Sequence, residues 1–210
     1  MSENEKFARL VGGRASVAST HLPIVEEDVA SADVAALYAD FRARFSRAEV
    51  PGILKCFATH PLLLRHMMDI AEGLIFADGH LVRRQKEMIA TLVSAQNSCA
   101  YCADSHGYAL RVNGGSAEVL CAIQQNDLVS ASLTDAERAL LLFVEKINLR
   151  SHEIRRADVD KLLRAGWSDL QIAEAVHVAA MFATYNRVVN AFGLKSQGLL
   201  SLYPGTDHAE

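Results

Sequence analysis

Two cysteines and a histidine lie close together in the middle of the chain, in the segment NSCAYCADSH at residues 97–106. On a helix, where successive residues turn by about 100°, Cys99, Cys102 and His106 fall within roughly 60° of one another and share one face. In the first turn of a helix, unpaired amides and the macrodipole favour a thiolate over a thiol. Because the thiolate is the form that attacks peroxides and disulfides, the segment predicts redox chemistry.

The two residues before the cysteines predict where this helix begins. The side chain of Asn97 or Ser98 can accept a hydrogen bond from the free amides of a first turn, as N-cap residues do. Both cysteines would then lie in or near that turn. The helix is expected to end at Asn113-Gly114, since these residues tolerate the left-handed conformation.

A glutamate upstream is a candidate partner for the histidine. Glu87 is followed by the apolar sequence MIATLV, so charge is scarce around it, unlike around most solvated glutamates. On one straight helix Glu87 would lie about 18 Å from Cys99, too far for contact. A break near Asn97-Ser98 is therefore needed, so that the helix containing Glu87 folds back beside the cysteine helix.

Other interpretations of the cysteines are weaker. A structural zinc site needs four ligands, and no second Cys or His pair at close spacing is present. A c-type haem needs a histidine directly after the second cysteine, where Ala103 stands. Cysteines three residues apart can also simply pack as small hydrophobes. We therefore predict no metal and no cofactor, while packing remains an alternative.

The spacing from Glu87 to His106, Glu-x11-Cys-x2-Cys-x3-His, resembles the core of the alkyl hydroperoxidase D group. This group belongs to the carboxymuconolactone decarboxylase superfamily, and the resemblance is to its peroxidase-related branch. It extends over roughly residues 22–200, through motifs in the same order: Leu22-Pro23, Val50-Pro51-Gly52-Ile53-Leu54, His60-Pro61, Gly166-Trp167-Ser168 and Tyr185-Asn186-Arg187. It implies a helical domain over residues 22–200, between tails at 1–21 and 201–210.

The resemblance implies catalytic positions for Glu87, Cys99, Cys102 and His106. Cys102 would attack a small hydroperoxide and become a sulfenic acid, Cys99 would resolve it into a disulfide, and an external dithiol would reduce that disulfide. His106 would take the thiol proton, and Glu87 would orient His106. Tyr101 stands where well-studied members have a second histidine, so no role is transferred from that histidine.

The resemblance thus implies a thiol-dependent peroxidase or disulfide reductase that forms homo-oligomers. One alternative is decarboxylation or isomerisation of a lactone acid, as in the branch that gives the superfamily its name, although those relatives generally lack the cysteine pair. Another is a redox-sensing or metal-binding helical module that is no enzyme and uses Cys99, Cys102 and His106 as ligands or as a switch.

Composition narrows the possible partners. The 210 residues are 50% hydrophobic, enough for a substantial core, and the net charge of -4 argues against binding nucleic acid. Charges interrupt every apolar run well short of the roughly 18 residues that span a membrane. The first twenty residues contain charges and no continuous apolar segment, which is typical of a flexible tail rather than a secretory signal. Because turnover needs reducible thiols, we expect a cytoplasmic protein.

Capping residues and helical spacing predict an all-α fold, with no alternating run that favours a sheet. The first expected helix follows Ser31, and its apolar stripe consists of Val34, Leu37, Tyr38, Phe41 and Phe45. A helix from Pro61 through Leu74, a loop at 77–80, and the helices of Glu87 and of the cysteines are expected next. The last four expected helices start at Ser116, run from Thr134 to near Leu149, occupy 157–164, and run from Ser168 to Gly193. Cys56 and Cys121 are expected to be buried, and Arg187 to form an ion pair.

Overall fold

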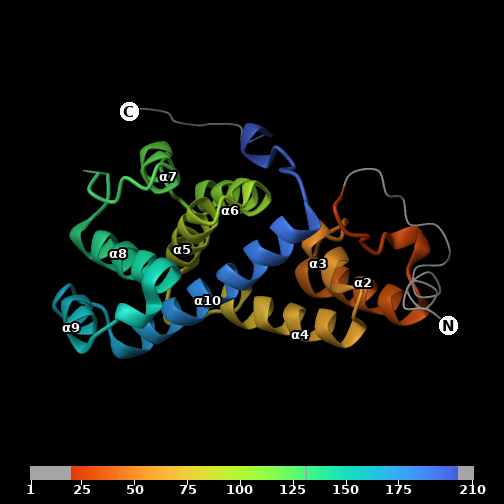
Figure 1. Cartoon of the computed structure of the whole chain (residues 1–210), viewed down its shortest axis with the longest axis horizontal. Helices are drawn as coiled ribbons and strands as arrows, with labels where there is room; N and C mark the ends of the chain where they lie inside the picture. Colours follow the sequence, from red (N-terminus) through yellow and green to blue (C-terminus); the bar gives the residue numbers. More distant parts are fainter. Residues whose placement is uncertain (1–19, 131, 203–210) are drawn as a thin grey trace. The chain divides into compact units, whose positions relative to one another are not determined.

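The computed structural model describes residues 20–130 and 132–202, and these residues form helices and no strand (Figure 1). The predicted all-α fold is confirmed. The chain divides into two compact units, one formed by the residues up to Gly73 with Val188–Leu194, the other by Leu74–Arg187 with the residues from Lys195 on. The single domain expected over 22–200 stays a prediction. Most of the two expected tails, residues 1–19 and 203–210, lies outside the described residues.

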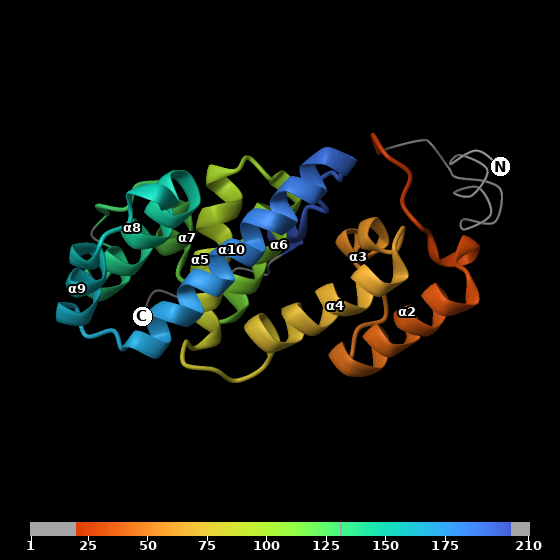
Figure 2. The same cartoon turned by 60° about the horizontal axis from the view of Figure 1, so that its bottom comes forward.

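The first unit contains a 3-10 turn at Glu27–Val29 and the helices α2 (Ala32–Phe45), α3 (Gly52–Phe57) and α4 (Pro61–Ala71). Both α2 and α3 pack against α4 (Figure 2). The Ser31 side chain caps α2 by accepting from the amide of Val34, and Pro61 occupies the first turn of α4, both as predicted. Four of the five predicted stripe residues of α2 are buried, namely Val34, Leu37, Tyr38 and Phe41.

The helix predicted through Leu74 changes its winding before that residue. Regular α-helix ends at Ala71, and Glu72–Phe76 form a π-helical turn. Turns of this type are rare and frequently lie at functional sites. The hydrophobic spacing of the sequence does not distinguish such a turn from α-helix, so it was not predicted.

The second unit contains α5 (Arg83–Gln96), α6 (Ala100–Val112), α7 (Ala117–Gln124), α8 (Asp135–Arg150), α9 (Arg156–Arg164) and most of α10 (Asp169–Phe192), with 3-10 turns at Ser151–Glu153 and Leu199–Leu202. Three of these helices, α6, α7 and α8, pack around α5 (Figure 1). Every residue from Lys86 to Ser94 is buried as a result. The buried stretch includes the polar residues Lys86, Glu87, Thr91 and Ser94, which need partners inside the protein.

Local signals for helix ends are mostly confirmed. Thr134 and Glu137 form a capping box at the start of α8, and Ser168 and Gln171 exchange the equivalent two hydrogen bonds before α10. Ser116 caps α7. Two helices are followed by glycines with positive φ, +86° at Gly114 and +75° at Gly193, which fits the predicted ends of α6 and α10.

A buried ion pair fixes the start of α5. Nζ of Lys86 lies 2.8 Å from Oε1 of Glu174 on α10 and donates to the carbonyl of Ala77 at 3.0 Å. The other carboxylate oxygen of Glu174 accepts from the amides of His80 and Leu81, at 2.5 and 2.8 Å. Lys86 and Glu174 therefore hold both ends of the loop predicted at 77–80 through hydrogen bonds to its backbone. This places the first turn of α5 with Lys86 and Glu87 in the interior.

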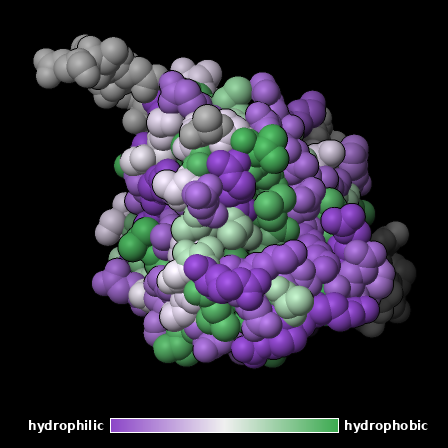
Figure 3. Space-filling view, turned by 90° about the vertical axis from the view of Figure 1, so that its left-hand side faces the viewer, coloured by the Kyte–Doolittle hydropathy of each residue, from purple (hydrophilic) through white to green (hydrophobic). Residues whose placement is uncertain are grey.

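The surface view in Figure 3 shows a face that is mostly hydrophilic, with hydrophobic residues in separate groups between the polar ones. Within residues 20–130 and 132–202, no helix is long and apolar enough to span a membrane.

Candidate active site

The two cysteines lie at the start of α6, as expected from their predicted place in a first turn. Cys99 is the N-cap residue and Cys102 lies in the first turn; both are free thiols, with 0% and 4% of their surface exposed. A reactant must therefore reach sulfur atoms that are almost fully enclosed. Tyr101, at the position of the relatives' second histidine, is also buried.

The predicted side-chain cap of this helix is wrong. Asn97 is the C-cap of α5, and its side chain donates to Asn148 at 3.1 Å. Ser98 has a φ of +51°, and the amide of Cys99 donates to the carbonyl of Ser94 at 2.9 Å. The physical reason is the short connection: Asn97 and Ser98 are used to close α5, so neither can cap α6.

The thiol pair favours an ionised sulfur at Cys99. Hydrogen bonding from the side chain of Cys102, assisted by the backbone of Cys102, lowers the pKa of Cys99 although burial opposes this change. The pKa of Cys99 is therefore lowered partly by a backbone group of the first turn, as the sequence indicated, and partly by the thiol of Cys102. A lowered pKa favours the thiolate, which is the form of cysteine that attacks.

The break between α5 and α6 brings Glu87 to His106, as predicted. Oε2 of Glu87 lies 2.7 Å from Nδ1 of His106, and the carboxylate has no exposed surface. An ionised carboxylate only accepts hydrogen bonds, so Nδ1 is the protonated nitrogen of the neutral ring. The second ring nitrogen, Nε2, is then the acceptor that can take a proton. The histidine side chain is 25% exposed.

The sequence analysis missed a second partner of Glu87. Nε of Arg83, one turn earlier on α5, lies 2.6 Å from Oε1 of Glu87, so each carboxylate oxygen has its own donor. Burial alone would raise the pKa of Glu87, but the attractions of His106 and Arg83 outweigh burial and hold this pKa below its usual range. The i, i+4 spacing of Arg83 and Glu87 is a typical ion-pair spacing on a helix and could have identified this partner.

Aromatic side chains from α10 complete the surroundings of His106. The ring of Phe182 meets the imidazole edge-on, with centroids 4.4 Å apart, and Tyr185 lies next to Phe182 at 6.2 Å. Burial raises the pKa of the Tyr185 hydroxyl, which therefore stays protonated. Such an apolar wall limits the access of water and fits an uncharged reactant.

The motif Tyr185-Asn186-Arg187 contributes differently at each position. Asn186 is fully buried, with its amide nitrogen donating to the carbonyl of Phe182 at 3.0 Å and its oxygen accepting from Ser94 at 3.1 Å. Arg187 is exposed and donates to the carbonyl of Ala183, so the ion pair expected for it is not found among the described residues. Arg187 follows Asn186 by one residue, so it lies on a different face of α10 from the buried Asn186.

The other two cysteines lie away from this cluster. Cys56 is buried as predicted, and burial raises its pKa to about 12.

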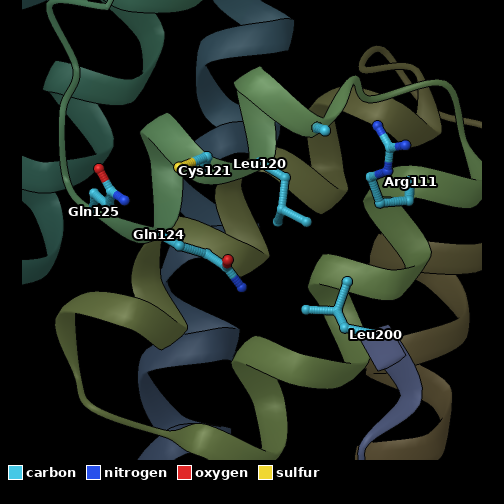
Figure 4. Close-up of a pocket in the computed structure, with 7 residues that line it drawn as sticks. Arg111, Leu120, Cys121, Gln124, Gln125 and Leu200 are labelled. Atoms are coloured by element: carbon cyan, nitrogen blue, oxygen red, sulfur yellow. The ribbon is translucent and has the colours of Figure 1, made fainter. Parts of the chain in front are cut away.

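The prediction that Cys121 is buried is wrong, because this residue is exposed on α7. It lines a cavity of 260 Å³ together with Arg111, Ala117, Leu120, Gln124, Gln125 and Leu200 (Figure 4). Figure 4 shows Leu120, Gln124 and Leu200 pointing toward one another across this space. None of the four predicted site residues lines it.

No metal site is evident in the part of the chain that the structure describes. No three His, Cys, Asp or Glu side chains there are placed to hold a metal ion together. The arrangement of Cys99, Cys102, His106 and Glu87 is instead suited to moving a proton between a thiol and an imidazole that a carboxylate orients.

Comparisons with known proteins match part of this chain to a known family and its fold to solved structures. Residues 61–146, which include Glu87, both site cysteines and His106, match the carboxymuconolactone decarboxylase family. A peroxidase-related protein with an alkylhydroperoxidase AhpD core from Ralstonia eutropha JMP134 has a similar structure, with a TM-score of 0.75 and 25% identity over 86% of this chain and 94% of that one. No match is found among curated proteins.

Two further solved structures share the fold. A peroxidase-related protein from Silicibacter sp. TM1040 has a TM-score of 0.71 and 26% identity, over 81% of this chain and 88% of that one. The debrominase Bmp8 has a TM-score of 0.69 over 90% of this chain and 97% of that one, and its 15% identity shows the fold alone. Together with the family match over residues 61–146, these likenesses support assignment of the chain to the carboxymuconolactone decarboxylase superfamily, and its helical fold is AhpD-like.

Proposed function

We propose that the protein is a thiol-dependent peroxidase that reduces small hydroperoxides through Cys99 and Cys102, with His106 and Glu87 as a proton relay. The observation that carries this proposal is the placement of two buried free thiols on the same helix as an imidazole, whose Nδ1 lies 2.7 Å from a fully buried carboxylate. The peroxidase-related relatives at 25% and 26% identity support the same reaction class.

The reaction begins with attack by a thiolate on the terminal oxygen of the hydroperoxide. The S–O bond forms as the O–O bond breaks, the leaving alkoxide takes a proton from His106, and the cysteine becomes a sulfenic acid. The second cysteine then attacks this sulfur atom, releasing water and forming the Cys99–Cys102 disulfide. An external dithiol reduces the disulfide, so the net reaction converts hydroperoxide and dithiol into alcohol, water and oxidised dithiol.

The cysteine that attacks first is proposed from two arguments. The family resemblance implies Cys102, which precedes His106 by one helical turn, so that this imidazole can take its proton. The lowered pKa of Cys99 results from the hydrogen bond that the thiol of Cys102 donates to it before reaction. Deprotonation of Cys102 by His106 then supplies the attacking sulfur, and Cys99 acts as the resolving residue.

The direct test is consumption of tert-butyl hydroperoxide with dithiothreitol as the reductant. The purified protein is expected to consume the hydroperoxide only when dithiothreitol is present, and the double variant Cys99→Ser/Cys102→Ser serves as the control. Equal rates for the wild-type protein and the double variant would overturn the proposal. Because the double variant retains Cys56 and Cys121, it also measures the background from those two thiols.

A further inference from the structure

Arg83 contacts the proposed relay at the carboxylate of Glu87. Its Nε lies 2.6 Å from Oε1 of Glu87, while Oε2 of the same carboxylate faces His106. The guanidinium carbon lies 4.6 Å from the centroid of the Phe76 ring, in the π-helical turn that precedes α5. The aromatic face therefore holds the arginine against Glu87, and the side chain of Arg83 is 29% exposed.

Charge balance suggests what this contact does. A fully buried carboxylate facing only a neutral imidazole would leave an uncompensated negative charge in the interior, which is costly. Without Arg83, the Glu87–His106 pair would reduce that cost by binding one proton more than the Nδ1 proton, either on the carboxylate or on Nε2. A pair that already holds this additional proton cannot accept one from a thiol.

With Arg83 present, the negative charge of Glu87 is balanced and the imidazole can remain neutral. When His106 then takes the proton of a thiol, the new positive charge is balanced by the thiolate formed on the same helix. We propose that Arg83 is a positioning residue that keeps Nε2 of His106 and the Glu87 carboxylate unprotonated in the resting protein, so that the pair can accept a proton from a cysteine. This inference rests on the proposed peroxidase function.

The neighbouring charged groups do not provide this balance. Lys86 is paired with Glu174 of α10, and Arg84 is paired with Glu137 of α8. On α7, Glu118 and Cys121 are exposed. On α6, Arg111 donates to the carbonyl of Gly115, and Asp104 accepts from the amides of Leu199 and Leu200. Cys99, Tyr101 and Cys102 on α6 and Tyr185 on α10 are buried and are not cations.

The test compares three variants with the wild-type protein. Arg83→Met removes the charge, Arg83→Lys retains it, and Arg84→Met is the matched control, since it removes a charge one residue away from a pair that does not touch Glu87. Proton uptake by the relay is followed through the imidazole resonance of His106 between pH 5 and pH 9, with the assignment made from the spectrum of His106→Gln.

In Arg83→Met the midpoint of proton uptake is expected to move to higher pH by about 1 to 3 pH units, the effect of removing a neighbouring charge. The acid limb of the kcat/KM profile should move with it, so that kcat/KM at any pH on that limb falls about tenfold for each pH unit of this shift. Arg83→Lys should restore most of the wild-type behaviour. Arg84→Met should leave the midpoint unchanged.

The inference is overturned if the midpoint in Arg83→Met equals that of the wild-type protein, or if Arg84→Met shifts it equally. Circular dichroism establishes that each variant is folded, and Arg83→Gln replaces Arg83→Met if the latter does not fold. The imidazole titration requires no turnover. A wild-type protein that consumes no hydroperoxide therefore contradicts the proposed function, while the titration still decides the role of Arg83.

Discussion

Oε2 of Glu87 on α5 lies 2.7 Å from Nδ1 of His106 on α6, although 19 positions separate the two residues along the chain. The contact exists because α5 ends at Gln96 and α6 starts at Ala100, a connection short enough to bring the two helices side by side. Since Glu87 has no exposed surface, its charge acts on its two partners and is little screened by solvent.

Replacing either site cysteine should abolish turnover in distinguishable ways. Cys102→Ser removes the proposed attacking thiolate with little change in size, so dithiol-driven consumption of hydroperoxide is expected to stop while the fold is retained. Cys99→Ser should also lose turnover but accumulate a sulfenic acid after a single exposure to hydroperoxide, because the resolving thiol is missing. Trapping with a sulfenic-acid reagent and mass spectrometry measures this. A sulfenic acid that forms in Cys102→Ser instead would show that Cys99 is the attacking cysteine and Cys102 the resolving one.

The rate of thiol alkylation should show that the resting Cys99 ionises more readily than an ordinary cysteine. Because hydrogen bonding from Cys102 lowers the pKa of Cys99, the rate of its reaction with iodoacetamide should reach half its maximum below about pH 8.5, the value for an unperturbed cysteine. Cys121→Ser provides a background without the exposed thiol. Cys56, whose pKa burial raises to about 12, should stay unmodified throughout and serves as the internal reference.

A double-mutant cycle should separate a proton relay from simple proximity. If His106 deprotonates the thiol and Glu87 orients His106, Glu87→Gln and His106→Gln should each reduce kcat/KM on the order of 10²-fold. The double variant should be little worse than either single variant, since residues that act as a unit are strongly non-additive. Losses that multiply in the double variant would argue against the relay, and a near-wild-type Glu87→Gln would remove Glu87 from the site.

Glu87 should also make the stability of the fold depend on pH. Its pKa in the folded protein is lowered, so the unfolded chain, where glutamate titrates near about pH 4.3, takes up this proton first as the pH falls. The stabilisation is therefore complete above that value and is lost as the pH falls toward the folded pKa. At pH 7, Glu87→Gln should lower the free energy of unfolding by about 1.5–3 kcal/mol.

Urea unfolding of the wild-type protein and Glu87→Gln at pH 7, 5, 4 and 3 measures this effect. The difference between the two proteins should narrow below about pH 4, because unfolded wild-type chains then take up a proton at Glu87 that the folded protein does not yet bind. The other carboxylates titrate in both proteins and cancel in the comparison. A difference that stays constant from pH 7 to pH 3 would show that the ionisation of Glu87 does not stabilise the fold.

Asp104 should control the order of the last described turn. Its two carboxylate oxygens accept from the amides of Leu199 and Leu200, both at 2.9 Å, and so hold the 3-10 turn Leu199–Leu202 against α6. Asp104→Asn should speed hydrogen exchange at these two amides by about tenfold or more, in line with the loss of a charged hydrogen bond. Ser105→Ala, which removes only a bond to the carbonyl of Tyr101 on the same helix, should leave them unchanged.

The sequence predicted best those features that depend on residues close together in the chain. The caps at Ser31, Ser116 and Thr134, the glycines after α6 and α10, and the shared face of the cysteines and His106 depend on neighbours within about a turn or two. The break before α6 was also predictable, because Glu87 could not otherwise approach His106. The side-chain cap failed because Asn97 and Ser98 serve the end of the preceding helix.

Features that depend on distant contacts were not predicted. Nothing in the local sequence identifies Phe182 as the neighbour of His106, since α10 is brought there by packing. The exposure of Cys121 likewise depends on which face of α7 meets α5, and a short apolar helix has more than one candidate face. The contact between Arg83 and Glu87 could be predicted only in part. Their i, i+4 spacing indicates an ion pair, but the sequence does not show that Glu87 is fully buried.

All the side chains that the proposed chemistry uses, from Arg83 to His106, lie on a single helical hairpin with its turn at 97–99. Contacts within such a hairpin close short loops, which costs little entropy and favours rapid formation. The proton pathway can therefore be inherited as one contiguous segment. Substitutions on α10, around Phe182, can then change which molecules reach the sulfur atoms while the hairpin retains the reaction, so that new substrates can evolve without rebuilding the chemistry.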